Sequence, residues 1–348
     1  MAKKIENTEK VYLGIDVHKR TYSVSCVVDG VVVKRAKMPA NGEGLVGFAR
    51  RSFPHGKFIS AYEAGFSGFG LHRFLVGQGF ENIVVNPASI EVAARDKVKT
   101  DRRDSAKVAI QLAAGRLKGI RVPPSDQELR RVVTRTRDQI VQNKTRLGHQ
   151  IKSKLYQFGL IGADDTRIMS EQFLDSYLKA ELEGELRFAL ESLVRLWRTM
   201  NEELKIYRRQ LHRQAKEDSK LEEVYRSIPG IGPIGARTLA NELGDLRQFQ
   251  NQRQLYSLTG LTPGEWSSGD NRRLGHISRQ GAARLRWILT EAAWVAIRRD
   301  PALRQDYERI SATAGGKRAI VAIARKLIGR VRACFRKAEP YQLGYEVA

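Results

Sequence analysis

Residues 11–17 read Val-Tyr-Leu-Gly-Ile-Asp-Val, an apolar run that is interrupted by one carboxylate, Asp16. The run predicts a buried strand, and a buried carboxylate needs a counter-charge. A second strand-like stretch, Phe-Ile-Ser-Ala-Tyr-Glu over residues 58–63, ends on Glu63. The first third of the chain therefore places acids on or at the ends of predicted strands.

Two further acids follow in Lys-Thr-Asp-Arg-Arg-Asp-Ser-Ala, residues 99–106. Asp101 and Asp104 are three residues apart near a predicted helix start, so both can lie on one helix face. Converging carboxylates need a counter-charge, which a divalent metal bound through oxygen ligands supplies, and phosphodiester chemistry uses such metals. The candidate catalytic and metal-binding residues are Asp16, Glu63, Asp101 and Asp104. For Asp16 alone, a salt-bridged strand end is the alternative.

The elements around these acids predict an α/β fold. The expected strands are 11–17, 22–28, 31–37, 58–63 and 82–86, and the expected helices are 42–52 and 68–78. Asp29-Gly30 joins the second and third strands as a hairpin turn, so the first three strands form an antiparallel meander. The order β-β-β-α-β-α-β-α is typical of a ribonuclease-H-like domain, which carries catalytic carboxylates on its first strand, its fourth strand and a late helix.

The remaining chain is predicted to be mainly helical. Apolar residues from 186 to 211 recur in alternating steps of four and three, which indicates a coiled-coil seam, and residues 129–155 show a looser version. We expect two long antiparallel helices that either pack on each other or offer a dimer seam, and two helices of an ordinary bundle are the alternative. The predicted domains are a catalytic domain (1–125), a coiled-coil assembly region (126–226) and a mainly α C-terminal domain (227–348).

Composition narrows the class of partner. The chain has 348 residues, a formal net charge of +23 and a pI near 10.2, which favours a nucleic-acid partner. Cys26 and Cys334 have no neighbouring Cys or His at ligand spacing, so we expect no structural zinc and a reducing compartment. Neither a membrane-spanning apolar run nor a signal core is evident, so we expect a soluble cytoplasmic protein.

Two glycine-rich segments late in the chain could contact phosphates. Residues 229–235, Pro-Gly-Ile-Gly-Pro-Ile-Gly, are similar to the hairpin of a helix-hairpin-helix element, and a plain turn before a helix is the alternative. Residues 260–281 predict a loop rich in Gly, Ser and Arg between two helices. Ser268 in this loop is a candidate nucleophile if it is activated, and a turn serine otherwise.

Cations surround these candidate sites. Arg102 and Arg103 lie between the two late acids, where they either contact a phosphate or balance the acids before metal arrives. The predicted nucleic-acid-binding residues are Lys19, Lys97, Lys99, Arg102, Arg103, Gly230, Gly232, Arg272, Arg273 and Arg279.

Six motifs then occur in a characteristic order. They are Gly14-Ile-Asp-Val-His-Lys19, Tyr62-Glu-Ala-Gly65, Val85-Asn-Pro87, Lys99-Thr-Asp-Arg-Arg-Asp-Ser-Ala106, Ile228-Pro-Gly-Ile-Gly232, and Gly260-Leu-Thr-Pro263 with Ser268-Gly269. From about residue 11 to 340, this order resembles the transposases of the insertion sequence 110 family, also called bridge-RNA-guided recombinases. The resemblance implies a RuvC-like domain with an Asp-Glu-Asp-Asp set, a coiled coil for assembly, and a transposase domain with an essential serine.

The resemblance also implies a mechanism. The serine maps onto Ser268, with Ser267 as the neighbouring choice. The acids bind Mg²⁺, and Mn²⁺ can replace Mg²⁺. A noncoding bridge RNA pairs with donor and target DNA, and the serine forms a covalent phosphoserine link before strand exchange through a Holliday junction. The active site is composite, with acids of one subunit meeting the serine of another in a dimer or tetramer. Such a protein works in the bacterial cytoplasm, at the nucleoid.

Two other functions stay open at this level. In a metal-dependent junction resolvase or nuclease, water attacks the phosphate and Ser268 is only structural. In a non-catalytic RNA- and DNA-binding scaffold, positive charge alone carries the function, and the acids do not matter for activity.

Overall fold

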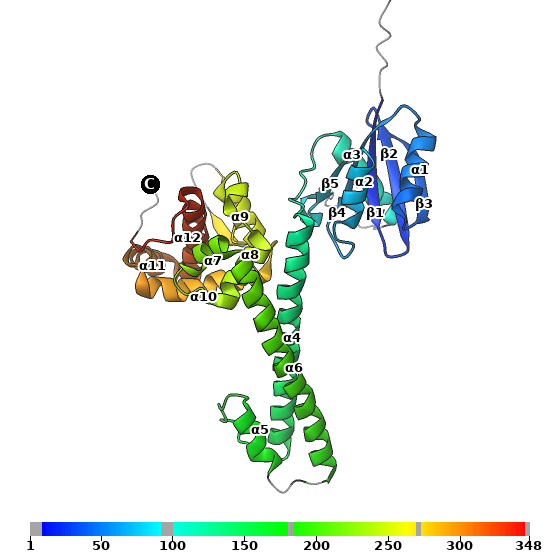
Figure 1. The fold of residues 1–348 in the computed structure, drawn as a ribbon. Helices are drawn as coiled ribbons and strands as arrows, with labels where there is room; N and C mark the ends of the chain where they lie inside the picture. The colour runs from blue at the N-terminus through cyan, green and yellow to red at the C-terminus, as the bar shows by residue number, and fades with distance from the viewer. Residues whose placement is uncertain (1–8, 92–99, 180–181, 183, 269–272, 345–348) are drawn as a thin grey trace, which may run out of the picture. The chain divides into compact units, whose positions relative to one another are not determined.

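The protein divides into two compact units, residues 1–123 and residues 124–348. The computed structural model describes residues 9–91, 100–179, 182, 184–268 and 273–344. The first unit is a five-stranded mixed sheet with helices, and the second is helical apart from a small two-stranded sheet (Figure 1). At this level the prediction of an α/β domain followed by a mainly α region is confirmed.

The first unit is built around a central strand. Its elements are β1 (Lys10–Val17), β2 (Thr21–Val28), β3 (Val31–Pro39), α1 (Gly42–Ser52), β4 (Lys57–Glu63), α2 (Gly70–Gly77), β5 (Glu81–Val85), the short 3₁₀ turn η1 (Pro87–Ser89) and α3 (Asp101–Ala113). The strand order is β3-β2-β1-β4-β5, with β1 antiparallel to β2 and parallel to β4. Because β1, β4 and β5 run parallel, their carboxyl ends meet at one edge of the sheet.

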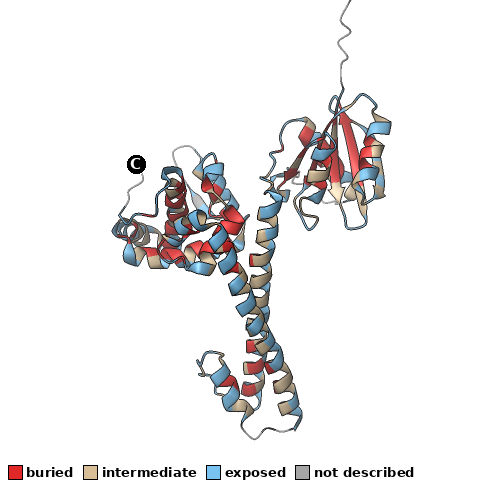
Figure 2. Cartoon of the chain, viewed as in Figure 1, coloured by how far each residue is buried: buried red, intermediate tan, exposed pale blue. Residues whose placement is uncertain are grey.

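The strands bury different residues on their two faces. Val11, Leu13 and Ile15 belong to the core shared with Leu45 of α1 and Leu75 of α2. The alternating pattern of a strand sends the intervening residues of β1 to the other face, which α3 covers. Figure 2 shows the buried residues concentrated along these strands. One face of β1 is thus structural, and the other face is available for the acids.

The second unit consists of helices and one short hairpin. Its elements are α4 (Ser125–Gln157), α5 (Glu171–Leu178), α6 (Gly184–Glu217), α7 (Ser219–Arg226), α8 (Pro233–Leu243), η2 (Leu246–Gln248), α9 (Gln252–Thr259), β6 (Pro263–Glu265), β7 (Leu274–Ile277), α10 (Ala283–Arg299), α11 (Pro301–Ala314) and α12 (Gly316–Lys337). No helix within the described residues combines the length and apolarity needed to cross a membrane.

The two long helices α4 and α6 pack side by side (Figure 1). Ile151 and Leu155 near the end of α4 share a buried cluster with Leu186 and Leu190 near the start of α6, so the pair is antiparallel. At its other end, α4 is tied to α8, because the Arg135 guanidinium donates to both carboxylate oxygens of Glu242 at 2.7 and 2.8 Å. The pair is therefore anchored at both of its ends.

The segment predicted as a loop between α9 and α10 contains the hairpin β6–β7, so this prediction was wrong in part. The backbone N–H of Trp266 donates to the Arg273 carbonyl at 2.9 Å. Gly264 and Gly275 leave room for the Trp266 indole, since a Cβ at Gly275 would lie 2.0 Å from its ring. The aromatic ring packs across two glycines and stabilises the hairpin. Composition alone predicts a loop here, because it does not register this packing.

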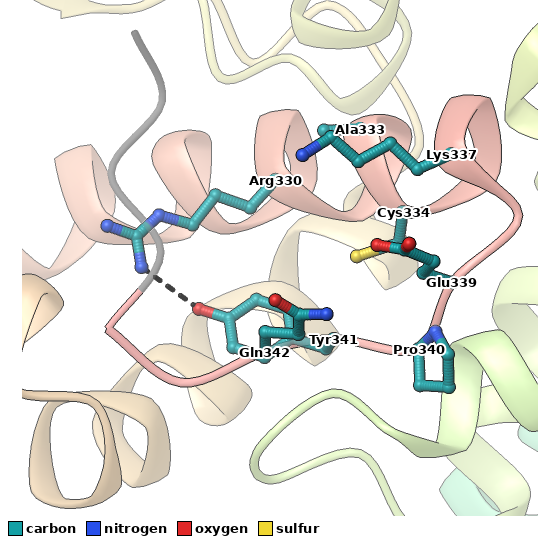
Figure 3. A pocket seen from close by; sticks show the side chains of 8 residues that line it. All are labelled: Arg330, Ala333, Cys334, Lys337, Glu339, Pro340, Tyr341 and Gln342. Atoms are coloured by element: carbon teal, nitrogen blue, oxygen red, sulfur yellow. Dashed lines mark hydrogen bonds between the residues drawn. The ribbon is translucent and has the colours of Figure 1, made fainter.

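A buried ion pair closes the C-terminal bundle. Asp300 is fully buried, and its Oδ2 accepts from Arg330 Nη1 at 2.8 Å and from Tyr341 Oη at 2.6 Å. Arg330 also donates to Tyr341 Oη at 3.2 Å (Figure 3). The pocket beside this contact has a free volume of about 20 Å³, enough for one water molecule but not for a substrate.

Removing the arginine of this pair is expected to destabilise the bundle strongly. Arg330→Met leaves the Asp300 carboxylate buried without its counter-ion and lowers the free energy of unfolding by about 3–5 kcal/mol. The matched control Arg336→Met, at an exposed position of the same helix, changes it by less than about 0.5 kcal/mol. Urea denaturation followed by circular dichroism measures both values, and equal losses would contradict the assigned role of the pair.

Candidate active site

Asp16 and Glu63 end neighbouring parallel strands. Ile15 of β1 pairs with Tyr62 of β4, so the residues that follow, Asp16 and Glu63, are next to each other in register. Both lie on the face that α3 covers, because strand residues two apart share a face. Asp16 is half-buried and Glu63 is exposed. The predicted acids of the first and fourth strands thus come from one edge of the sheet.

Helix α3 begins with the other two acids. Thr100 Oγ1 accepts a hydrogen bond from the Arg103 backbone N–H at 3.4 Å, which caps the helix just before Asp101. Asp101 and Asp104 therefore lie in the first turn, where the helix dipole favours negative charge. The Lys107 ammonium lies 3.8 Å from Asp104 Oδ1.

Gly14 sets how closely α3 approaches the sheet. A Cβ at Gly14 would lie 2.1 Å from the Ser105 carbonyl oxygen and 2.4 Å from the Ala109 nitrogen. Beside this contact, the hydroxyls of Ser25 and Ser105 form a buried hydrogen bond of 2.9 Å. The helix backbone therefore rests directly on β1, which brings its first turn to Asp16.

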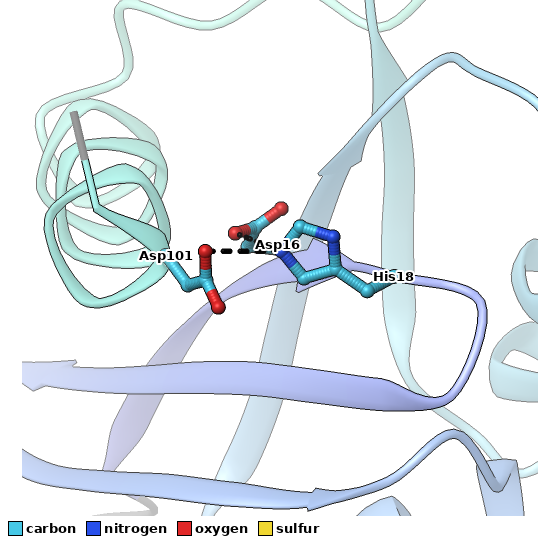
Figure 4. A group of neighbouring side chains, drawn as sticks. All are labelled: Asp16, His18 and Asp101. Atoms are coloured by element: carbon cyan, nitrogen blue, oxygen red, sulfur yellow. Dashed lines mark hydrogen bonds and ion pairs between the residues drawn. The ribbon is translucent and has the colours of Figure 1, made fainter.

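Three side chains meet at this point (Figure 4). His18 Nε2 lies 3.1 Å from Asp16 Oδ2 and 3.2 Å from Asp101 Oδ1. One potential ligand atom from each of these residues lies within 4.8 Å of the others. Lys37 of β3 donates to Asp101 Oδ2 at 3.1 Å. Two carboxylates and an imidazole at such separations fit the donor set of a divalent cation.

The electrostatics of the cluster are asymmetric. Burial raises the pKa of the Asp16 carboxyl, and the charges of Asp101 and Asp104 add to this effect against the opposing influence of His18. The hydrogen bond from Lys37 lowers the pKa of Asp101. Asp16 thus carries its charge at a cost that a bound cation would relieve.

His18 and Lys37 are functional candidates that the sequence reasoning missed. His18 is two residues after Asp16, so strand periodicity alone could have placed it on the same face. Lys37 could be found only from the register, because Asp16 pairs with Ser23 and Ser23 pairs with Lys37 across three strands.

The serine pair lies on the hairpin of the second unit. Ser267 Oγ donates to Glu265 Oε1 at 2.8 Å and accepts from the Arg273 backbone N–H at 3.2 Å. Ser268 is exposed, and within the described ranges its hydroxyl has no hydrogen-bond partner. The hairpin therefore engages one serine hydroxyl and leaves the other open to solvent. Arg273 and Arg279 are also exposed.

Comparisons with known proteins agree with this layout. Residues 13–159 match the model of the DEDD transposase domain of IS110 elements, and residues 222–308 match the Transposase IS116/IS110/IS902 family. A putative transposase y4qE of Sinorhizobium fredii is 28% identical over 83% of this chain and 73% of its own length. The transposase for insertion sequence element IS1533 of Leptospira borgpetersenii is 26% identical over 95% of this chain and 97% of its own length.

The chain belongs to the IS110 family of transposases. It is therefore an enzyme of DNA transposition, and its substrates are DNA. The transposase for insertion sequence element IS1111A of Coxiella burnetii, 27% identical over 78% of this chain and 76% of its own length, is another similar protein. The DEDD domain of this transposase also implies the use of a divalent metal, which the Asp16, His18 and Asp101 cluster could hold.

Two glycines of the transposase that were predicted to approach a phosphate also have structural roles. Gly230 has a φ of +84°, and a Cβ there would lie 2.9 Å from the Ala292 Cα of α10. Gly232 is the N-cap of α8. Phosphate binding at these glycines stays a prediction.

Three of the cations that are predicted to contact nucleic acid are exposed in the first unit. Lys19, Arg102 and Arg103 are exposed in the first unit, around the acids of β1 and α3. Lys97, Lys99 and Arg272 lie outside the described residues.

Asp16→Asn is expected to abolish Mn²⁺ binding to the transposase and to raise its free energy of unfolding at neutral pH. Because burial raises the pKa of Asp16 above its ordinary value of 3.8, the ionised carboxylate destabilises the metal-free fold at pH values above the raised pKa. This destabilisation disappears as the pH falls below 3.8, so the gain in the variant disappears there too.

Electron paramagnetic resonance of free Mn²⁺ and chemical denaturation at several pH values measure the two effects. Asp29→Asn, at an exposed turn of the same unit, is the matched control and should change neither. Unaltered Mn²⁺ affinity in Asp16→Asn would contradict the assignment of this site.

Proposed function

We propose that this transposase is an RNA-guided DNA recombinase of an insertion sequence, with a divalent metal at its acids and a serine nucleophile. The acids in question are Asp16, Glu63, Asp101 and Asp104, and the nucleophile is Ser268. The observation that carries the proposal is the convergence of Asp16 and Asp101, from a strand end and a helix start far apart in the sequence, on one potential cation site. Mg²⁺ is the proposed metal, and Mn²⁺ can replace it.

The topology supports a ribonuclease-H-like, RuvC-like catalytic domain. Three antiparallel strands are followed by two parallel strands in the order β3-β2-β1-β4-β5. Acids come from the ends of β1 and β4 and from the first turn of α3. A bound metal would stabilise the charge that develops on a scissile phosphate.

The serine step conserves the energy of the broken bond. The Ser268 oxygen attacks the phosphorus and loses its proton, and the bond from phosphorus to the 3′ oxygen breaks. That oxygen takes up a proton and leaves as a free 3′ hydroxyl, while the 5′ phosphate stays on the serine. Attack by another 3′ hydroxyl reverses the step and joins new strands. The exposure of the Ser268 hydroxyl supports this role.

An RNA guide and an oligomeric assembly complete the proposal. The net charge of +23 suits a protein that binds both RNA and DNA. Base pairing would supply sequence specificity, while the protein would contact the nucleic-acid backbone and recognise the shape of the duplexes. The antiparallel α4–α6 pair is proposed to act as a coiled coil between copies of the chain, and exposed apolar residues such as Leu129 and Val132 on α4 support that use.

Ser268→Ala is expected to abolish a covalent protein–DNA adduct. The adduct is detected as labelled DNA that migrates with the denatured protein on a gel, after incubation with DNA that carries the element ends. Ser267→Ala is the matched control, because Ser267 is already hydrogen-bonded within the hairpin, and it should retain the adduct.

Loss of the adduct in Ser267→Ala alone would move the nucleophile to Ser267. Strand cleavage without any adduct in the wild-type protein would overturn the serine mechanism and favour a junction resolvase or nuclease in which water attacks.

The RNA guide has its own test. We expect that the protein, expressed with the native flanks of its gene and purified in high salt, retains one discrete structured RNA from a flank. Sequencing of the bound nucleic acid measures this. A mixture of host RNAs would contradict RNA guidance and leave the family's DNA transposition activity without a guide.

A further inference from the structure

The face of the sheet that carries the acids is open at its outer strand. Helix α3 rests on β1 through Gly14 and on β2 through Ser25. Strand β3 is the edge strand beyond β2. Between β3 and the first turn of α3 lies a groove of about 580 Å³, a volume typical of ligand clefts. We call this the β3–α3 groove, and the polar residues that line it include Ser23, Ser25, Arg35, Lys37, Asp101 and Arg102.

The groove presents cations in register with the acids. Asp16, Ser23 and Lys37 form one cross-strand row, while Ser25 and Arg35 continue the adjacent row from Gly14. Lys37 lies where the groove meets the acid cluster, because its Nζ is 3.1 Å from Asp101 Oδ2. Within the described part of the chain, the Arg35 guanidinium has neither a hydrogen-bond nor an ion-pair partner.

We propose that the β3–α3 groove binds backbone phosphates of the DNA strand that enters the acid cluster. Strand residues two apart lie about 6.6 Å from each other, which is close to the spacing of successive phosphates along an extended strand. Lys37 and Arg35 can therefore meet consecutive phosphates, with Arg102 on the opposite wall of the groove. Because the groove is continuous with Asp101, its occupant is the strand that reacts, and that strand is DNA in this family. The inference rests on the family's action on DNA and requires neither the serine mechanism nor the RNA guide.

Charges on an edge strand have another ordinary role. They prevent unwanted pairing with the edge of a second sheet. Edge protection is served by charges on either face of β3, whereas phosphate binding requires the charges on the face that lines the groove. Lys34 provides the comparison, because its ammonium lies over the Phe48 ring of α1 at 5.6 Å, on the opposite face of the sheet.

The test compares Arg35→Gln with the matched control Lys34→Gln in the full-length protein. Arg35 is chosen over Lys37 because it has no contact with the acids. Affinity for a fluorescein-labelled DNA duplex is measured by anisotropy in EDTA at several salt concentrations. Loss of one phosphate contact makes the negative slope of log K against log salt shallower by about 0.9. The salt-dependent loss of affinity between about 50 and 200 mM therefore shrinks about threefold to fourfold in Arg35→Gln and stays unchanged in Lys34→Gln.

Several outcomes would overturn the proposal. An unchanged slope in Arg35→Gln, or an equal change in Lys34→Gln, would leave only edge protection as the role of these cations. A change confined to an RNA duplex of the same sequence would assign the groove to RNA instead of DNA. Mn²⁺ affinity equal to that of the wild-type protein shows that Arg35→Gln keeps the acid site folded. Because binding in EDTA uses neither metal nor serine chemistry, failure of the proposed mechanism would not alter this result.

Discussion

The contact of Gly14 with the backbone of α3 is the constraint on which the acid site depends. Any side chain at Gly14 would overlap the Ser105 carbonyl and the Ala109 nitrogen, so the helix would have to move outward. Interiors pack too densely to absorb such a shift locally. The separation of Asp16 and Asp101 is therefore set by a missing side chain two residues before Asp16, and the Ser25–Ser105 hydrogen bond holds the same interface.

The gathering of acids creates an electrostatic conflict that other residues moderate. Burial and the neighbouring acids raise the pKa of Asp16, while Lys37 lowers that of Asp101. His18 lies between both carboxylates. The Lys37 ammonium thus lies close to the place where a metal would bind, and the fold tolerates like charges that destabilise it. Such a local loss of folding stability is common at functional sites, because the arrangement of groups that activity needs is often a destabilising one.

In the helical unit, two long polar helices are held together by different contacts at their two ends. Apolar burial fastens one end of the α4–α6 pair through Leu155 and Leu186. Ionic contacts to the bundle fasten the other end, with the buried Arg237 guanidinium 3.2 Å from Asp218 and 3.5 Å from Glu222. Breaking a buried pair by removing one partner is strongly destabilising. The α4–α6 pair therefore depends on apolar burial toward one end and on charged groups, paired with residues of α8, at the other.

The sequence by itself determined the strands and helices of the first unit and its acids, because strand alternation, a hairpin turn and a helix start are local properties. It identified Asp16 and Asp101 as candidates before their meeting could be known, and it missed His18 despite its strand periodicity. Only the tertiary structure decided that Lys37 reaches Asp101, since that contact depends on the register of three strands. The same holds for the two serines. Ser267 is hydrogen-bonded within the hairpin and Ser268 is exposed, and this hairpin is packed by the Trp266 ring across two glycines. Register and packing are non-local, and they decide which predicted groups meet.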